Sequence, residues 1–184
     1  MEQLYKTDRL VIRRWRDADA ADLFEYCGNA EVTKYLPFPT YTSVADSYTR
    51  FADMRGRYAK YDGGDRNANV DFAIELGGKV IGSVGFVGYR ESAGGVVEIG
   101  YLLNPKYQGK GYMTEVVLGM FRYIKQNKLA MRIEAKHDVE NPASGCVMQK
   151  AGMKFEGVGR KAFDNNNGKR RDVACYAILI EEIK

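Results

Sequence analysis

The chain has 184 residues, of which 45% are hydrophobic and 28% charged, with a formal net charge of +4. This length predicts one domain over residues 1–184, with a core that needs no disulfide bonds. The weak, mixed charge argues against a nucleic-acid-binding protein, and no apolar run is long enough to cross a membrane. Three separated cysteines and a single histidine, His137, provide no metal-ligand cluster. We therefore expect a soluble cytoplasmic protein without a metal.

The first part of the chain predicts one strand followed by a helix. Apolar residues alternate over residues 9–15, which predicts a strand with Arg13 on its outward face. A helix is expected from Asp17, as its N-cap, to Gly28, with a short helical turn over residues 29–35.

A second, longer helix is predicted after an irregular, proline-bearing connection. Ser43 and Asp46 form a capping-box pattern at its start. Helical spacing predicts one core-facing stripe, made of Val44, Tyr48, Phe51, Met54 and Tyr58. The polar residues 62–69 that follow predict a mobile loop.

Two strands, residues 70–76 and 79–87, are predicted around the hairpin signal Gly77-Gly78. The second strand carries a glycine at every third position, namely Gly82, Gly85 and Gly88. Such a density of glycine predicts bulges, or a close approach by another backbone or by a ligand. A loop over residues 89–95 then leads to the next strand.

The most informative stretch is a strand over residues 96–103, a glycine-bearing turn, and a helix from Tyr112 to about Asn127. Gly109 and Gly111 lack a Cβ, so the backbone there can turn sharply and an anion can come close to its N–H groups. The free N–H groups and the positive dipole end of the next helix add to the attraction. The turn is therefore a candidate phosphate-binding site.

The last part of the chain predicts a short strand over residues 131–135, parallel to the strand before the glycine turn. A helix follows, with Asn141 as N-cap and Gly152 closing it. Two final strands are expected over residues 153–161 and 169–180. The basic cluster 169–171 is either a solvated hairpin end or a contact for a phosphate or an acidic partner.

Among phosphate-binding motifs, a Walker loop is excluded because Lys110 is followed by glycine and not by Ser or Thr. A dinucleotide fingerprint fits poorly, with Thr114 at its third small position. The turn instead resembles the Gln/Arg-x-x-Gly-x-Gly/Ala segment of the GCN5-related N-acetyltransferases, which holds the pyrophosphate of coenzyme A. The alternative is a plain strand-to-helix turn. The resemblance implies that the cofactor is bound by Gln108, Gly109, Lys110, Gly111, Tyr112 and Met113.

Two further segments resemble the RimJ/RimL-type members of that family. They are Thr7-Asp8-Arg9-Leu10 and the helix that opens Asn141-Pro142-Ala143-Ser144 and ends Lys150-Ala151-Gly152-Met153. The predicted order of elements is also similar. The resemblance implies an α/β fold with a mixed, mostly antiparallel sheet of about seven strands, helices on both faces, and a splayed parallel strand pair at the acetyl-CoA site.

The resemblance also implies acetyl transfer from acetyl-CoA to a primary amine. A backbone N–H near Leu102 or Leu103 would contact the thioester oxygen. Glu98 would accept the amine proton directly or through water, unless it only forms a salt bridge. Ser144 would protonate the departing thiolate, unless it only satisfies the helix start. Asn141 would hold the pantetheine arm or the acceptor backbone.

The acceptor class stays open in the sequence. The resemblance implies N-terminal α-amines of ribosomal proteins, and an α-amine, with a pKa of about 8, is partly neutral in the cell. Polyamines, amino acids and antibiotics are alternatives, as are an inactive acetyl-CoA-binding regulator and a pure interaction domain. The protein is expected to be a monomer or homodimer. Aromatic residues that either line an acceptor groove or pack in the core are Tyr35, Phe38, Tyr41, Tyr48, Tyr58 and Tyr61.

Overall fold

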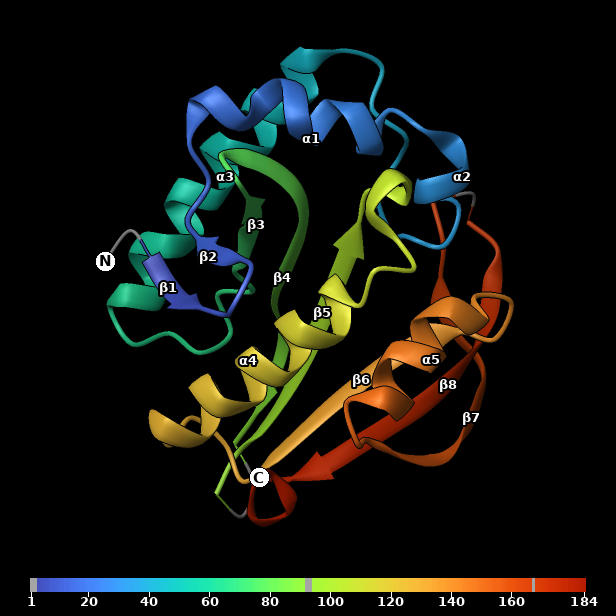
Figure 1. The fold of residues 1–184 in the computed structure, drawn as a ribbon. Helices are drawn as coiled ribbons and strands as arrows, with labels where there is room; N and C mark the ends of the chain where they lie inside the picture. Colours follow the sequence, from blue (N-terminus) through green and yellow to red (C-terminus); the bar gives the residue numbers. More distant parts are fainter. Residues whose placement is uncertain (1–2, 92–93, 167) are drawn as a thin grey trace.

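The computed structural model describes residues 3–91, 94–166 and 168–184. These residues form one eight-stranded sheet in the order β1-β2-β3-β4-β5-β6-β8-β7 (Figure 1). Neighbouring strands are antiparallel except β5 and β6, which are parallel. The predicted mixed α/β class and the parallel crossover are confirmed. The sheet has one strand more than the seven or so expected.

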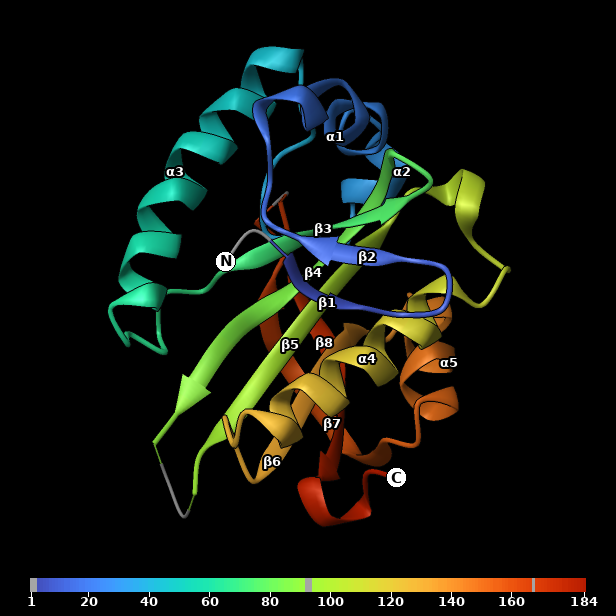
Figure 2. The same ribbon diagram turned by 60° about the vertical axis from the view of Figure 1, so that its left-hand side comes forward.

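The elements of the N-terminal half are β1 (Gln3–Lys6), β2 (Val11–Arg13), α1 (Ala20–Cys27), α2 (Ala30–Thr33), α3 (Val44–Asp62), β3 (Asp71–Leu76) and β4 (Lys79–Arg90). Those of the C-terminal half are β5 (Val96–Leu103), α4 (Tyr112–Gln126), β6 (Arg132–Asp138), α5 (Pro142–Lys150), β7 (Lys154–Asp164) and β8 (Arg170–Leu179). Figure 2 shows α3 and α4 packed on different sides of the central strands β4 and β5. The tips of two predicted loops, at residues 92–93 and 167, lie outside the described residues.

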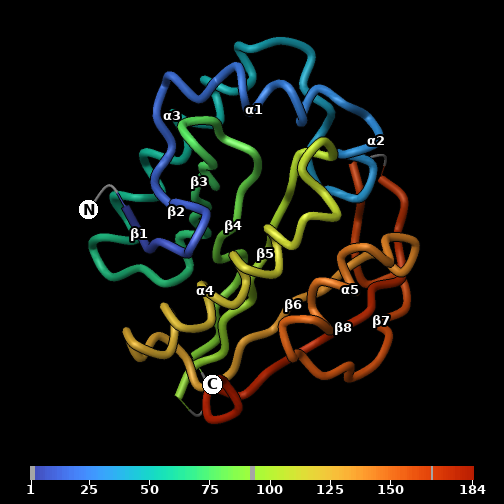
Figure 3. Tube along the Cα trace, in the orientation of Figure 1, coloured from blue at the N-terminus to red at the C-terminus, as the bar shows by residue number. Residues whose placement is uncertain are grey.

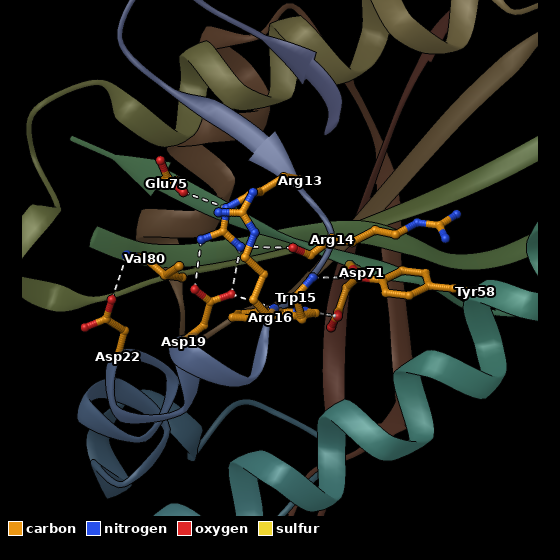
Figure 4. A network of polar contacts seen from close by, with 10 residues as sticks. All are labelled: Arg13, Arg14, Trp15, Arg16, Asp19, Asp22, Tyr58, Asp71, Glu75 and Val80. Carbon is orange, nitrogen blue, oxygen red and sulfur yellow. Dashed lines mark hydrogen bonds and ion pairs between the residues drawn. The ribbon is translucent and has the colours of Figure 1, made fainter. Parts of the chain in front are cut away.

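The N-terminal segment differs most from its prediction. Strand β1 was not predicted. It is only four residues long and its pairing with β2 has a register shift, so its sequence shows no alternation of apolar and polar residues. Arg13, expected on the outward face, is 3% exposed and donates to Asp19 at 2.7 Å and Glu75 at 2.6 Å (Figure 4). Asp17 does not cap α1, because a 3-10 turn intervenes and Asp19 takes the N-cap position.

Helix α3 begins with the predicted capping box of Ser43 and Asp46. Its inward face is shifted from the prediction, because Ser47 is buried while Tyr48 is 48% exposed. Phe51 and Met54 are buried as expected. The buried stripe runs through Ser47, Phe51, Met54 and Tyr58, so a small polar residue takes the inward position that the prediction gave to Tyr48.

Strand β4 has both the close backbone approach and the bulge that its glycines predicted. Gly77 and Gly78 turn the hairpin with φ values of 55° and 87°. A Cβ on Gly82 would lie 2.3 Å from the Leu102 carbonyl oxygen, which only glycine permits. The register against β5 shifts between Phe86 and Gly88, and this bulge bends β4.

The parallel pairing of β5 with β6 is short, and it leaves a space between the two strands. It joins Val96–Glu98 to Arg132–Glu134, and beyond it the strands diverge (Figures 1 and 3). β6 continues along β8, while β5 continues along β4 to Leu103. The second half of β5 therefore presents an edge toward the space between the two strands.

Candidate active site

Two hollows lie beside the diverging strands. The first, which we call the glycine groove, has a volume of about 570 Å³ and lies between the end of β5, the turn after it, and α5. Its lining includes all but one of the predicted cofactor-binding residues: Leu102, Leu103, Gln108, Gly109, Gly111, Tyr112, Met113 and Asn141. The exception is Lys110, whose ammonium instead donates to the Lys106 carbonyl at 3.3 Å and lies over the Tyr107 ring.

The turn that closes the glycine groove is held by its own side chains. Asn104 accepts from the Lys106 N–H at 3.1 Å and so starts a 3-10 turn with Pro105 at its first position. Gln108 Nε2 donates to the Leu103 carbonyl at 3.3 Å, which ties the turn to the end of β5. Asn104 and Pro105, a breaker pair that stops the strand, thus form an ordered connection between β5 and the two glycines.

The glycine positions meet the requirements of an anion site. Gly109 and Gly111 have φ values of 74° and 77°, in the left-handed region. Gly111 is the N-cap of α4 and has no side chain to cap the helix, so the N–H groups of the first turn stay available to a ligand. Met113 is buried in the core, so its side chain does not close the groove.

Two residues of the N-terminal segment, Thr7 and Arg9, hold the first turn of α4 in place through hydrogen bonds. Thr7 Oγ1 donates to Glu115 Oε1 at 2.5 Å, and Arg9 Nε donates to Glu115 Oε2 at 2.6 Å. Arg9 Nη1 also donates to the Lys110 carbonyl at 3.2 Å, and its guanidinium lies over the Tyr112 ring. Burial by itself would raise the pKa of Glu115. These hydrogen bonds outweigh burial and hold the pKa below its usual value. The segment Thr7–Leu10, known from sequence only as a resemblance, therefore supports the glycine groove.

The register decides which backbone group of β5 faces the space between the strands. The Asn104 N–H donates to the Ile81 carbonyl of the β4 chain at 2.8 Å, and Leu102 pairs with Ser83. Because polar backbone groups alternate between the two edges of a strand, the Leu102 N–H also faces β4 and the Leu103 N–H faces away from it. The bond from Gln108 to the Leu103 carbonyl agrees with this orientation.

The second hollow, the charged hollow, has a volume of about 560 Å³ and shares part of its lining with the glycine groove. Five residues line both: Tyr35, Tyr101, Leu102, Asn141 and Ser144. Ser144 Oγ donates to Tyr101 Oη at 3.1 Å, and Tyr101 Oη donates to the Ser144 carbonyl at 2.9 Å. Burial raises the pKa of Tyr101 well above its usual value, so the hydroxyl keeps its proton at neutral pH.

Tyr101 was missed in the sequence because an aromatic residue in an apolar strand is usually part of the core, and it is the only aromatic residue of β5. Its only signal is its position, one residue before Leu102. Asn141 occupies the predicted N-cap position with Pro142 after it, but its side chain makes no capping bond. The Asn141 amide is therefore free to face the place where the two hollows meet.

The charged hollow contains Glu98, which is 22% exposed and pairs with Lys136 at 2.7 Å. The structure thus places Glu98 both in a salt bridge and on the wall of the hollow. Tyr35 and Phe38 also line it, whereas Tyr58 is buried and donates to the Asp71 carbonyl at 2.6 Å.

The basic cluster at the start of β8 is not simply a solvated hairpin end. Arg171 donates to Asp138 Oδ2 at 2.7 Å and also pairs with Glu140. Asp138 Oδ1 in turn accepts from the Glu140 N–H at 2.9 Å. These contacts fix the connection between β6 and α5, immediately before Asn141. Lys169 and Arg170 are exposed, so only Arg171 of the cluster is bound in this way, by partners more than thirty residues away in the sequence.

Within the described ranges, no three His, Cys, Asp or Glu side chains lie close enough together to hold a metal ion. No helix in the same part of the chain is long and apolar enough to cross a membrane.

A family model described as an acetyltransferase (GNAT) domain matches residues 9–154. The chain is 31% identical over 176 residues to the uncharacterized N-acetyltransferase YnaD of Bacillus subtilis, covering 96% of both chains. It is 27% identical over 158 residues to the [ribosomal protein uS5]-alanine N-acetyltransferase of Escherichia coli, covering 84% of this chain and 79% of that protein.

Among solved structures, RimL, a ribosomal L7/L12 α-N-protein acetyltransferase in complex with coenzyme A, has a TM-score of 0.82 at 21% identity. The superposition covers 98% of this chain and 99% of that one, a likeness that concerns the fold. With the family match over most of the chain, these findings agree with the glycine turn and the splayed strands. The chain belongs to the GCN5-related N-acetyltransferase family and is an acetyl-CoA-dependent N-acetyltransferase.

Proposed function

We propose that this enzyme acetylates the α-amino group at the N-terminus of a protein or peptide. The observation that carries the proposal is the meeting of the two hollows at Tyr101, Leu102, Asn141 and Ser144. A cosubstrate in the glycine groove and an acceptor in the charged hollow would touch only there. Direct transfer between two bound substrates needs such an arrangement, because reacting atoms must be held close and aligned.

The residues of the glycine groove fit acetyl-CoA, which supplies the acetyl group as a thioester. The left-handed conformations of Gly109 and Gly111 allow a diphosphate to come close to the backbone, and the open start of α4 provides N–H donors. Asn141 would hold the pantetheine arm through its amide. Lys110, directed toward Lys106, would contribute only by its charge.

The chain supplies three groups to the reaction. The Leu103 N–H donates to the carbonyl oxygen as that oxygen gains negative charge. Glu98 accepts a proton from the acceptor nitrogen, directly or through water, while the C–N bond forms. Ser144, whose hydroxyl donates to Tyr101 Oη in this structure, gives its proton to the sulfur as the C–S bond breaks. Solvent then returns a proton to Ser144, and Glu98 releases its proton to solvent. One proton leaves the amine and one reaches the sulfur, so the exchange balances.

The charges of the hollow favour a peptide over a polyamine. Each carboxylate of the described lining already has a basic partner: Asp71 with Arg50, Glu98 with Lys136, and Asp138 with Arg171. A polyamine would need a free carboxylate for its second ammonium group. A peptide presents a single amine followed by a largely neutral backbone. The likeness to the uS5-alanine acetyltransferase supports the same acceptor class.

The test is an acetyl-CoA consumption screen with mass spectrometry of the products. We expect peptides that begin with Ala or Ser to be acetylated at the α-amine, in preference to polyamines, amino acids and aminoglycosides. A peptide with a blocked N-terminus and an internal Lys is the matched control and should not react. Faster acetylation of a small amine would contradict the proposal, and tight acetyl-CoA binding without any turnover would indicate a regulator.

A further inference from the structure

One end of the charged hollow is built around an arginine. Asp71 of β3, Gly85 of β4 and Gly100 of β5 are cross-strand neighbours in one row. Two of these three positions have no side chain, and the Val87 side chain lies over Gly100. Asp71 and Gly100 both line the hollow and lie two strand spacings, about 10 Å, apart.

Asp71 is fully engaged by protein groups. Its Oδ1 accepts from the Trp15 indole N–H at 2.8 Å, and its Oδ2 accepts from Arg50 of α3. Figure 4 shows Trp15 directed at this carboxylate from the end of β2, with Tyr58 of α3 beside it. The role of Asp71 is therefore to hold Arg50 in position, and not to bind a ligand.

Arg50, in contrast, has donors to spare. A guanidinium carries five N–H groups in a planar fork, and within the described residues Asp71 is the only acceptor found for them. The side chain lines the hollow, is 26% exposed, and lies beside the ring of Phe38. The negative charge of Asp71 raises the pKa of Arg50, which stays a cation. No Arg50 nitrogen is among the buried, unpaired side-chain atoms of the described residues, so its remaining donors are accessible to a ligand in the hollow. A carboxylate matches their planar geometry.

We propose that Arg50 binds a carboxylate of the acceptor, so that the enzyme selects amines that carry an acidic group at a distance from the reacting nitrogen. The inference rests on the proposed function and narrows its substrate class. The carboxylate has two possible sources, an acidic side chain near a peptide N-terminus or the α-carboxylate of an amino acid.

The geometry favours the peptide source. The amine must reach the space beside β5, whereas Arg50 is held by Asp71, whose backbone lies about 10 Å from that of Gly100 across the sheet. An extended chain advances roughly 3.3–3.6 Å per residue, so an acidic side chain at the second or third residue spans this distance. The α-carboxylate of a free amino acid is separated from its amine by a single carbon and does not.

The test compares C-terminally amidated peptides that begin with Ala and carry Glu or Gln at position two or three. For the wild-type enzyme we expect kcat/KM to be at least about tenfold higher with Glu, from hydrogen bonds to a charged group. Arg50→Lys keeps a cation for Asp71 but loses the planar fork, so this preference should fall to about twofold or less.

A double variant, Arg50→Gln with Asp71→Asn, guards against a misfolded single variant because it leaves no unpaired charge. It should show no preference for Glu. Arg55→Gln is the matched control, since it removes a cation from the same helix at a site that is 62% exposed and paired with Asp17. Its preference should equal that of the wild type.

Equal rates with Glu and Gln peptides in the wild type would overturn the inference, as would a preference that survives both variants. Free amino acids that react faster than their amides, with the difference lost in Arg50→Lys, would support a carboxylate site and assign the second source. A measurement without turnover separates this inference from the proposed function. N-acetylated Glu and Gln peptides are titrated calorimetrically into the CoA complex, and equal affinities would refute the role of Arg50 even if no acceptor is ever turned over.

Discussion

The glycine groove and the charged hollow are built in different ways. The groove is lined largely by one stretch of chain, Tyr101 to Thr114, together with residues at α2 and along α5, and the donors that it offers to an anion are backbone N–H groups at the start of α4. The hollow is made of side chains from helices α1 and α3 and from strands β3 to β8, with three ion pairs in its wall. A backbone site tolerates most changes of side chain, whereas a site made of paired charges changes selectivity with each substitution. With acetyl-CoA in the groove and the acceptor in the hollow, as proposed, substitutions outside the five shared residues should change acceptor choice with little effect on acetyl-CoA binding.

The largest effect should come from the groove. Gly111→Val would force a branched residue to a φ of 77° and place methyl groups against the bound diphosphate. We expect CoA affinity to fall on the order of 10²-fold or more, from the loss of two charged hydrogen bonds worth about 1.5–3 kcal/mol each. Calorimetric titration with CoA measures it.

The control for that substitution is Gly64→Val. Gly64 also has a left-handed φ, of 97°, but no atom lies within 4 Å of its added Cβ and it is not among the groove residues. It should cost a similar backbone strain without loss of CoA binding. Native circular dichroism with unchanged CoA affinity in Gly111→Val would refute the phosphate site.

The next effect concerns the place where the two hollows meet. Ser144→Ala should lower kcat and kcat/KM together by about 10²-fold, because the hydroxyl acts only as the sulfur gains charge. The CoA dissociation constant of the same variant should not change. Since Tyr101 shares a hydrogen bond with Ser144, adding Tyr101→Phe should cost much less than it does alone. Full kcat in Ser144→Ala would reduce the serine to a helix-start hydroxyl.

A smaller, pH-dependent effect is expected in the charged hollow. Glu98→Gln removes the proton acceptor, so only amine already deprotonated by solvent can react. The rate should fall by roughly tenfold at neutral pH, below the usual range for a general base because solvent deprotonates part of an α-amine, and recover as the pH rises past the acceptor pKa of about 8. The pH profile of kcat/KM decides it. Identical profiles in both proteins, each following the free amine, would leave Glu98 with only its salt bridge to Lys136.

The last prediction is that removal of metal ions has no effect on activity. If backbone amides alone hold the diphosphate, treatment with a chelator should leave activity unchanged. Activity that is lost with the chelator and restored by zinc or magnesium would contradict a site made of backbone donors. The assay needs an acceptor identified in the screen described above.

Local interactions explain what was predictable from the sequence. The bounds of β5 and the start of α4 at Tyr112 agree with the prediction, because a breaker pair, two left-handed glycines and a helix start act within a dozen residues. The hairpin at Gly77-Gly78 and the capping box at Ser43 follow for the same reason. The sequence alone thus located the glycine turn between β5 and α4, and the resemblance of that turn to the acetyltransferase family implied the fold class and the reaction type.

Tertiary structure decided the rest, because it depends on which distant residues meet. Ser144 finds Tyr101 across 43 positions, and Glu115 finds Thr7 across 108. Register makes Leu103, and not Leu102, the residue whose N–H faces the diverging strands. Arg13 is buried only because Asp19 and Glu75 reach it. No local sequence pattern predicts such pairings, because a charged or hydroxyl residue is the same letter in the sequence whether its side chain faces water or a partner.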